Sequence, residues 1–157
     1  MSNPFEPPRA NLQMRNDEPG SIPKAVAVGV LIDIVGTIAA GFAASIGYGL
    51  VLGLRGYSEA AIMQTFEKLD PTSPFALFTY CLGMLVSGVA GYHCARIANR
   101  RTYLAPGILA MISCAFGAAL SAGQYTQKAL LILSALTVIS VLIGASLYVK
   151  KMGSVAG

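Results

Sequence analysis

The stretch VLIDIVGTIAAGFAASIGYGLVLGL, residues 30–54, decides the fold class of this chain. A helix that crosses a bilayer needs about 20 predominantly apolar residues, and this stretch exceeds that length. Asp33 is the one Asp, Glu, Lys, Arg or His residue in it. The stretch therefore predicts a membrane-spanning helix, and it raises the question of what a carboxylate does inside one.

The composition of the whole chain agrees with lipid as the solvent. Hydrophobic residues make up 55% of the 157 residues and charged residues only 11%, whereas a soluble domain carries about 25% charged residues. We assign the net charge of +4 to cytoplasmic loops of a membrane protein. No nucleic-acid-binding motif accompanies it, so nucleic acid is not an expected partner.

Four apolar segments are long enough to cross a membrane, and they span about 24–54, 75–98, 103–122 and 129–149. The chain is predicted to be an all-α integral membrane protein with four transmembrane helices, because backbone groups in lipid must be satisfied within each segment. The transmembrane domain then covers 24–149. Residues 1–23, rich in Pro and charge, are expected to be a disordered cytoplasmic tail, and 150–157 a short cytoplasmic tail.

The basic residues predict the orientation of these spans. Eight of them lie in the N-terminal tail, the second loop and the C-terminus: Arg9, Arg15, Lys24, Arg96, Arg100, Arg101, Lys150 and Lys151. The other side has three, which are Arg55, Lys68 and Lys128. The positive-inside rule then predicts that both termini are cytoplasmic.

The first outer loop is predicted to contain a short amphipathic helix. Ser58 can cap its start, and Ile62, Phe66 and Leu69 follow on one face. Such a helix would lie on the outer leaflet or cap the bundle. The alternative is a lid over a substrate path.

Small residues follow one face of each span, and in lipid such faces pack helices together. The residues expected to carry this packing are Gly29, Gly36, Ala40, Gly47, Gly83, Ser87, Gly91, Gly107 and Gly117. We expect a tight four-helix bundle with the first three spans in closest contact. A glycine-lined pore is the alternative interpretation.

Asp33 lies on the small-residue face of the first span, so we expect it to point into the bundle or toward a partner. Its depth stays open, because the first segment is longer than the membrane is thick. The hydrocarbon core can begin near residue 26 or near residue 34 of this segment. His93 and Arg96, near the inner end of the second span, are its expected partners. Asp33 then either makes a structural contact with one of them or is merely solvated. The alternative is a proton or cation relay of Asp33 and His93, since a histidine can share a proton with a carboxylate.

Other chemistry is not indicated by the sequence. Cys81, Cys94 and Cys114 are interpreted as small buried hydrophobes, so no metal site or cofactor is expected. No hydrolase or protease motif is present, and we expect no enzyme. Ser87 and Ser113 are expected to bond backbone carbonyls across helices.

Two segments resemble known sequences. NPFEPPRANL, residues 3–12, resembles the Pro-rich openings of many small bacterial inner-membrane proteins. GVAGYHCARIANRRTYLAPGILAM, residues 88–111, resembles a recurring GGY-x-x-AR-x-A helix end in uncharacterised four-span bacterial families, with Ala90 in place of the first Gly. The resemblance implies four helices in a bacterial inner membrane, and it implies no activity.

The expected role is that of a non-catalytic accessory or assembly subunit that packs against itself or another membrane protein. The alternative is a small oligomeric transporter or channel with Asp33 and His93 on a proton or cation path. Apart from the lipid bilayer, the expected partner is a second copy or another membrane protein.

Overall fold

The computed structural model describes residues 20–99, 103–120 and 126–155, and the regular structure in these ranges is helical. Five helices follow in order: α1 (Ile22–Leu54), α2 (Glu59–Glu67), α3 (Pro74–Ala98), α4 (Leu104–Leu120) and α5 (Gln127–Val155). Of the predicted tail 1–23, residues 1–19 lie outside the described residues. The last two residues of this tail, Ile22 and Pro23, already belong to α1.

Three of these helices, α1, α3 and α5, are long and apolar enough to cross a membrane. The third predicted span, 103–122, corresponds to α4, which has 17 residues. At 1.5 Å per residue α4 is about 25 Å long, less than the roughly 30 Å of a hydrocarbon core. Helix α5 continues past the predicted end at 149 and reaches Val155.

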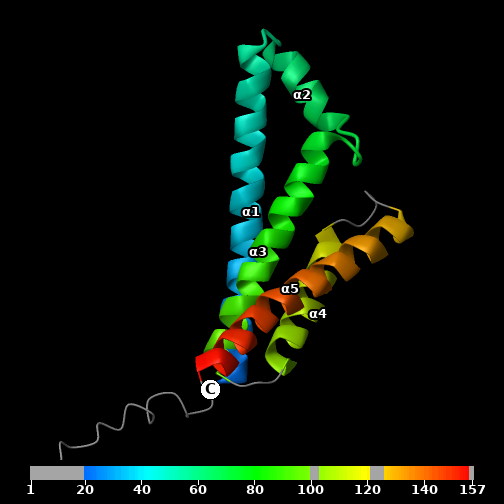
Figure 1. Ribbon diagram of the computed structural model, residues 1–157. Helices are drawn as coiled ribbons and strands as arrows, with labels where there is room; N and C mark the ends of the chain where they lie inside the picture. The colour runs from blue at the N-terminus through cyan, green and yellow to red at the C-terminus, as the bar shows by residue number, and fades with distance from the viewer. Residues whose placement is uncertain (1–19, 100–102, 121–125, 156–157) are drawn as a thin grey trace, which may run out of the picture.

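The helices converge at one end of the molecule and diverge at the other (Figure 1). We call the converging end, where α1 begins and α5 ends, the termini end, and the opposite end the α2 end. Helix α3 makes the most extensive interfaces, with α1 on one side and with α5 on the other, while α4 packs on α1, α3 and α5. Among the described residues, α1 and α5 do not contact each other.

This arrangement corrects one prediction from the sequence. The first three spans were expected to be in closest contact, but the last helix, α5, packs on α3 about as extensively as α1 does. The contact of α3 with the third predicted span, α4, is smaller.

The buried core lies at the termini end and consists mainly of small residues. Its members are Ala25, Val26, Ala90, Cys94, Ala98, Ala105, Leu109, Ala110 and Val141. Alanines and a cysteine at the contact let helix axes approach closely, which is how helices pack in lipid. Because these residues come from α1, α3, α4 and α5, they close the termini end of the molecule.

Two glycines bring the backbones of α3 and α5 into direct contact. A Cβ atom on Gly91 would overlap the carbonyl oxygen of Val141, and a Cβ atom on Gly144 would overlap the carbonyl oxygen of Gly88. The Ser140 hydroxyl also donates a hydrogen bond to the carbonyl oxygen of Met84 across this interface. A side chain at Gly91 or Gly144 would therefore push α5 away from α3.

The predicted helix in the first loop is present as α2, and it bridges the separated ends of α1 and α3. The Ser58 hydroxyl accepts a hydrogen bond from the backbone N–H of Ala61 at 3.4 Å. Phe66 of α2 meets the ring of Tyr48 edge-on at 5.8 Å, and Tyr48 stacks on Phe75 of α3 at 4.2 Å. These aromatic contacts join α1, α2 and α3.

A tight turn follows α2 and leads into α3. The Asp70 carboxylate accepts hydrogen bonds from the backbone N–H of Thr72 at 2.8 Å and from its hydroxyl at 2.7 Å. The backbone bond, and then the hydroxyl bond, lower the pKa of this exposed carboxyl from its ordinary value. The turn also brings Ser73 into position to cap α3.

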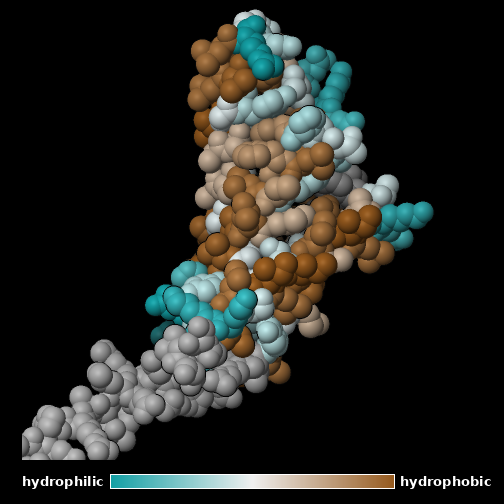
Figure 2. Space-filling view, viewed as in Figure 1, coloured by the Kyte–Doolittle hydropathy of each residue, from teal (hydrophilic) through white to brown (hydrophobic). Residues whose placement is uncertain are grey.

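The surface carries apolar residues along the flanks of the long helices and hydrophilic residues at the two ends (Figure 2). The exposed large side chains include Phe42 and Ile46 of α1, Leu85 of α3 and Leu131 of α5. In water such a surface would be an aggregation hazard, so its extent agrees with contact to lipid.

Gly144→Ala is expected to destabilise the protein. The added methyl group has to displace the α3 backbone, and overpacking of this kind costs about 1–3 kcal/mol. Unfolding of the purified protein in detergent micelles, followed by circular dichroism against denaturant, measures the loss.

Gly53→Ala is the matched control, because open space surrounds the position where its Cβ atom would lie. It should keep or raise stability, since alanine favours a helix over glycine by about 1 kcal/mol. An equal change in the free energy of unfolding in Gly144→Ala and Gly53→Ala would show that α5 is not held against α3 as described.

Candidate functional site

Asp33, the carboxylate in the apolar segment of α1, is buried where α1, α3 and α4 meet. Its side chain is 6% exposed. The Ser87 hydroxyl of α3 donates a hydrogen bond to Oδ1 at 2.7 Å, and the Ser113 hydroxyl of α4 donates a short hydrogen bond to Oδ2. Both carboxylate oxygens thus have a donor, which offsets the cost of removing a charged group from water.

The two serines lie at the middle of their helices. The central residue of α3 is Val86 and that of α4 is Ile112, so Ser87 and Ser113 are each one residue from the midpoint. Asp33 therefore lies level with the middle of α3 and α4, although it is only 11 residues beyond the first residue of α1. The level of its neighbours, and not its position in α1, fixes its depth within the fold.

A cavity of about 270 Å³ extends from Asp33 toward the α2 end. Residues of α1, α3, α4 and α5 line it. Thr37, Thr79, Ser87, Ser113 and Thr137 contribute hydroxyls, while Phe116, Leu120 and Leu133 contribute apolar walls. The cavity thus combines one carboxylate with several neutral oxygen atoms.

The opposite side of Asp33, toward the termini end, is closed by the apolar core. A Cβ atom on Gly29, one turn below Asp33, would lie 2.9 Å from Cδ2 of Leu109 and 3.1 Å from Cβ of Cys94. Leu109 and Cys94 are fully buried. Asp33 consequently lies at the closed end of the cavity, directly above a packed apolar layer.

The expected partners of Asp33 lie elsewhere. Arg96 is nine residues beyond Ser87 on α3, or roughly 14 Å along the helix axis, and it is exposed near the termini end. His93 lines a different cavity, between α3 and α5. Asp33 accepts its hydrogen bonds within the described residues from Ser87 and Ser113, so the structure does not bring His93 or Arg96 to the carboxylate.

The residues predicted to pack helices divide into two groups. Gly29, Gly36, Gly83 and Gly91 face atoms of a neighbouring helix within 4 Å, Ser87 bonds Asp33, and Ala40 is half-buried. The positions where Gly47, Gly107 and Gly117 would carry a Cβ atom have nothing within 4 Å. Gly117 instead lines the cavity above Asp33.

The role of the two serines was missed, because they were expected to bond backbone carbonyls. Ser87 lies on the predicted small-residue face of its helix, so its inward direction could be read from the sequence. Ser113 precedes Cys114, which lies on the same helix face as Gly107, seven residues before it. A small hydroxyl at mid-span, with a carboxylate on another helix, is the signal that could have connected them.

The three cysteines have different surroundings. Cys94 is buried, Cys114 is half-buried and Cys81 is exposed, which contradicts the interpretation of all three as buried. The thiol of Cys114 donates to the carbonyl oxygen of Ser134 at 3.5 Å. Within the described ranges, no three residues of the types His, Cys, Asp and Glu gather into a metal-binding group.

Comparisons with protein-family models, with curated proteins and with solved structures find no match for this chain. The site therefore has to be interpreted from its own geometry.

Ser87→Ala and Ser113→Ala are each expected to lower stability by about 1 kcal/mol, the scale of a hydrogen bond between helices in lipid. Their effects should be strongly coupled to Asp33, because Asp33→Leu removes the acceptor that both hydroxyls serve. A double-mutant cycle on unfolding in detergent micelles measures this coupling.

Ser45→Ala is the control, since Ser45 lies on α1 about three turns beyond Asp33. Additive effects of Asp33→Leu with Ser87→Ala and with Ser113→Ala would mean that the hydroxyls do not act through the carboxylate.

Proposed function

We propose that this chain is a four-span protein of a bacterial inner membrane that binds a proton or a small monovalent cation at Asp33 as the binding step of transport. The observation that carries the proposal is the carboxylate at the closed end of a hydroxyl-lined cavity, with a serine donor on each oxygen. Ionisable residues inside spans are costly, and they commonly mark ion or proton pathways.

The chemistry of the cavity supports a small cation over a larger solute. A carboxylate and hydroxyl oxygens are hard ligands, which suit a proton or an alkali cation. When the site is empty of cations, the two serine hydroxyls stabilise the negative charge. When a cation binds, the same hydroxyls can turn their oxygen atoms toward it, because a hydroxyl both donates and accepts.

The proposed orientation places the termini end in the cytoplasm and the α2 end outside. The eight basic residues of the termini side against three on the other side support it. In this orientation the cavity faces outward, and Leu109 and Cys94 separate Asp33 from the cytoplasm. Transport then requires a second conformation in which this apolar layer opens.

A lipid-soluble carbodiimide tests binding at Asp33 directly, because the reagent modifies protonated carboxyls in apolar surroundings. Dicyclohexylcarbodiimide should modify Asp33 in proteoliposomes, less so as the pH rises. Mass spectrometry of the modified peptide measures it. Slower modification with added Na⁺, K⁺ or Li⁺ at constant pH would identify a metal cation as the competing ligand, and no effect of any of the three would leave the proton as the ligand.

The corresponding flux experiment uses pH-sensitive or Na⁺-sensitive dyes inside liposomes. Asp33→Asn keeps the shape of the side chain and should abolish flux, while Asp70→Asn, at the exposed turn before α3, should leave it unchanged. Absence of both modification and flux in the unaltered protein would refute the proposal.

A second candidate function, that of an accessory or assembly subunit, is favoured by the outer half of α1. Gly36 packs against Val86, but nothing lies within 4 Å of the Cβ position of Gly47, three turns further along the same face. Small-residue faces of this kind join helices in lipid. The open half of α1 is therefore suited to a second copy or another membrane protein.

Gly47→Leu is expected to weaken such an assembly, since the larger side chain keeps a partner helix away. Gly41→Leu is the matched control, because Gly41 also has open space but points about 120° away around the helix. The mass of the intact complex, purified gently at native abundance, is the measurement. If the unaltered protein and both variants are all monomers without a partner protein, the accessory role is contradicted.

A further inference from the structure

A second cavity lies on the flank between α3 and α5, separate from the one at Asp33. Its volume is about 660 Å³. Leu85 and Val89 of α3 form one side, and Ile143 and Leu147 of α5 form the other. We call it the α3–α5 groove.

The groove owes its shape to the backbone contact between the two helices. Gly88 and Gly144, which have no side chains, form its floor where α3 and α5 touch. The larger side chains on either side stand out from the surface, with Leu85 68% and Leu147 59% exposed. An elongated apolar chain can lie between these two rims in contact with both helices.

The groove reaches from just past the middle of α3 toward the membrane surface at the termini end. From Cys81 to His93, its two ends on α3, there are 12 residues, or about 18 Å along the helix. From Val86, the middle of α3, to Arg96 there are ten residues, or about 15 Å, which is the contribution of one leaflet to the hydrocarbon core. The end at His93 lies toward the termini end, where Tyr92 meets His93 and Tyr148 edge-on, each at 5.7 Å. Clustered aromatic rings with polar tips are typical of the headgroup level.

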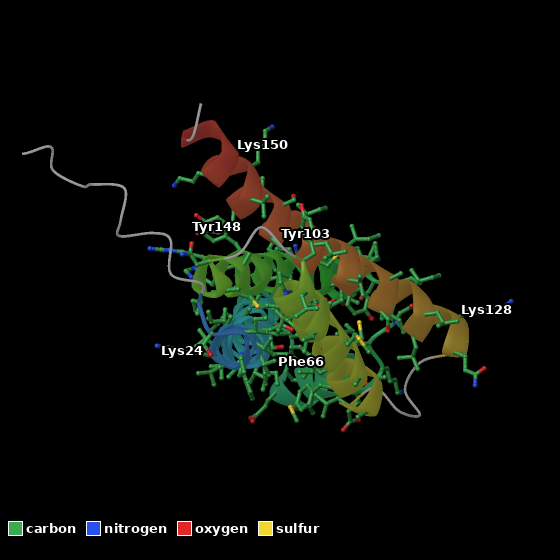
Figure 3. All side chains as sticks on the ribbon, turned by 90° about the horizontal axis from the view of Figure 1, so that it is seen from below. Lys24, Phe66, Tyr103, Lys128, Tyr148 and Lys150 are labelled. Atoms are coloured by element: carbon green, nitrogen blue, oxygen red, sulfur yellow. The ribbon has the colours of Figure 1, made fainter. Side chains whose placement is uncertain are left out.

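Beyond these rings the groove meets only positive charge. Arg96 lies one turn past Tyr92 on α3, and Lys150 and Lys151 lie one turn past Leu147 on α5; all three are exposed. Figure 3 shows Tyr148 and Lys150 together at this end of α5 and Lys128 at the other. The acidic residues of the described chain are Asp33, Glu59, Glu67 and Asp70, and none of them lies at the termini end.

We propose that the α3–α5 groove binds an anionic phospholipid of the leaflet at the termini end. One acyl chain lies between Leu85, Val89 and Leu147, and the phosphate lies against Arg96, Lys150 and Lys151. The apolar groove supplies contact with the chain, and the cations supply the preference for negative charge. This inference does not depend on cation binding at Asp33.

The experiment compares two lipids with identical acyl chains. The protein in detergent micelles is titrated with dioleoyl phosphatidylglycerol or dioleoyl phosphatidylcholine, and native mass spectrometry counts the bound lipids. We expect tighter binding of the anionic lipid. Each cation that contacts the headgroup should contribute about fivefold in affinity, so the triple variant Arg96→Gln, Lys150→Gln, Lys151→Gln should lose most of the preference.

Two further variants separate the groove from general surface charge. Val89→Trp, on the exposed rim, should weaken binding of both lipids by filling the groove. The triple variant Arg55→Gln, Lys68→Gln, Lys128→Gln removes equal charge at the α2 end and should keep the preference.

Three results would overturn the proposal. The first is equal binding of the two lipids by the unaltered protein. The second is an equal loss in both triple variants, which would mean nonspecific charge attraction. The third is unchanged binding in Val89→Trp, which would mean that the lipid contacts the basic residues without occupying the groove.

Discussion

The carboxylate of Asp33 has to find its hydrogen-bond donors within the protein, because an apolar surrounding offers none. It finds them on two other helices, at Ser87 of α3 and Ser113 of α4. Small-residue packing alone tolerates sliding of one helix along another, whereas a hydrogen bond has a fixed length and direction. The two bonds therefore set the register of α1, α3 and α4 at one level, and the close fit of Gly29 to Leu109 and Cys94 lies one turn below it.

The same level divides the molecule into a closed and an open part. Toward the termini end the facing residues are small, such as Ala90 and Ala110, and the helices meet in a buried core. Toward the α2 end a cavity is lined by larger side chains, Phe116, Leu120 and Leu133, of which Phe116 and Leu120 are exposed. The small residues let the helices meet at the termini end, and Asp33 faces the cavity on its other side.

Hydropathy predicted the helices well, because membrane spans carry a strong compositional signal. The predicted segments 24–54 and 75–98 begin within two residues of α1 and α3 and end at the same residues. Helical periodicity also predicted that Asp33 points inward. Periodicity defines a face, however, and not the neighbour across from it or the level at which two helices meet.

The separation of Arg96 from Asp33 has this cause. Its depth and that of Asp33 were both estimated from helix ends, but α1 is 33 residues long and α3 only 25. The register is fixed by contacts between helices, which no single segment contains. For the same reason the sequence did not predict that α5 packs on α3 through Gly91 and Gly144, since that crossing depends on where two backbones touch.

The two proposed roles place a common demand on the half of α1 toward the α2 end. As a transporter, the protein needs walls around its cavity, yet α1 and α5 make no contact within the described residues. As an accessory subunit, it needs a partner for the small-residue face around Gly47, which has none. A neighbouring helix on that face would meet both demands at once. Assembly with a second copy or another membrane protein is therefore a condition of cation transport in this fold as much as an alternative to it.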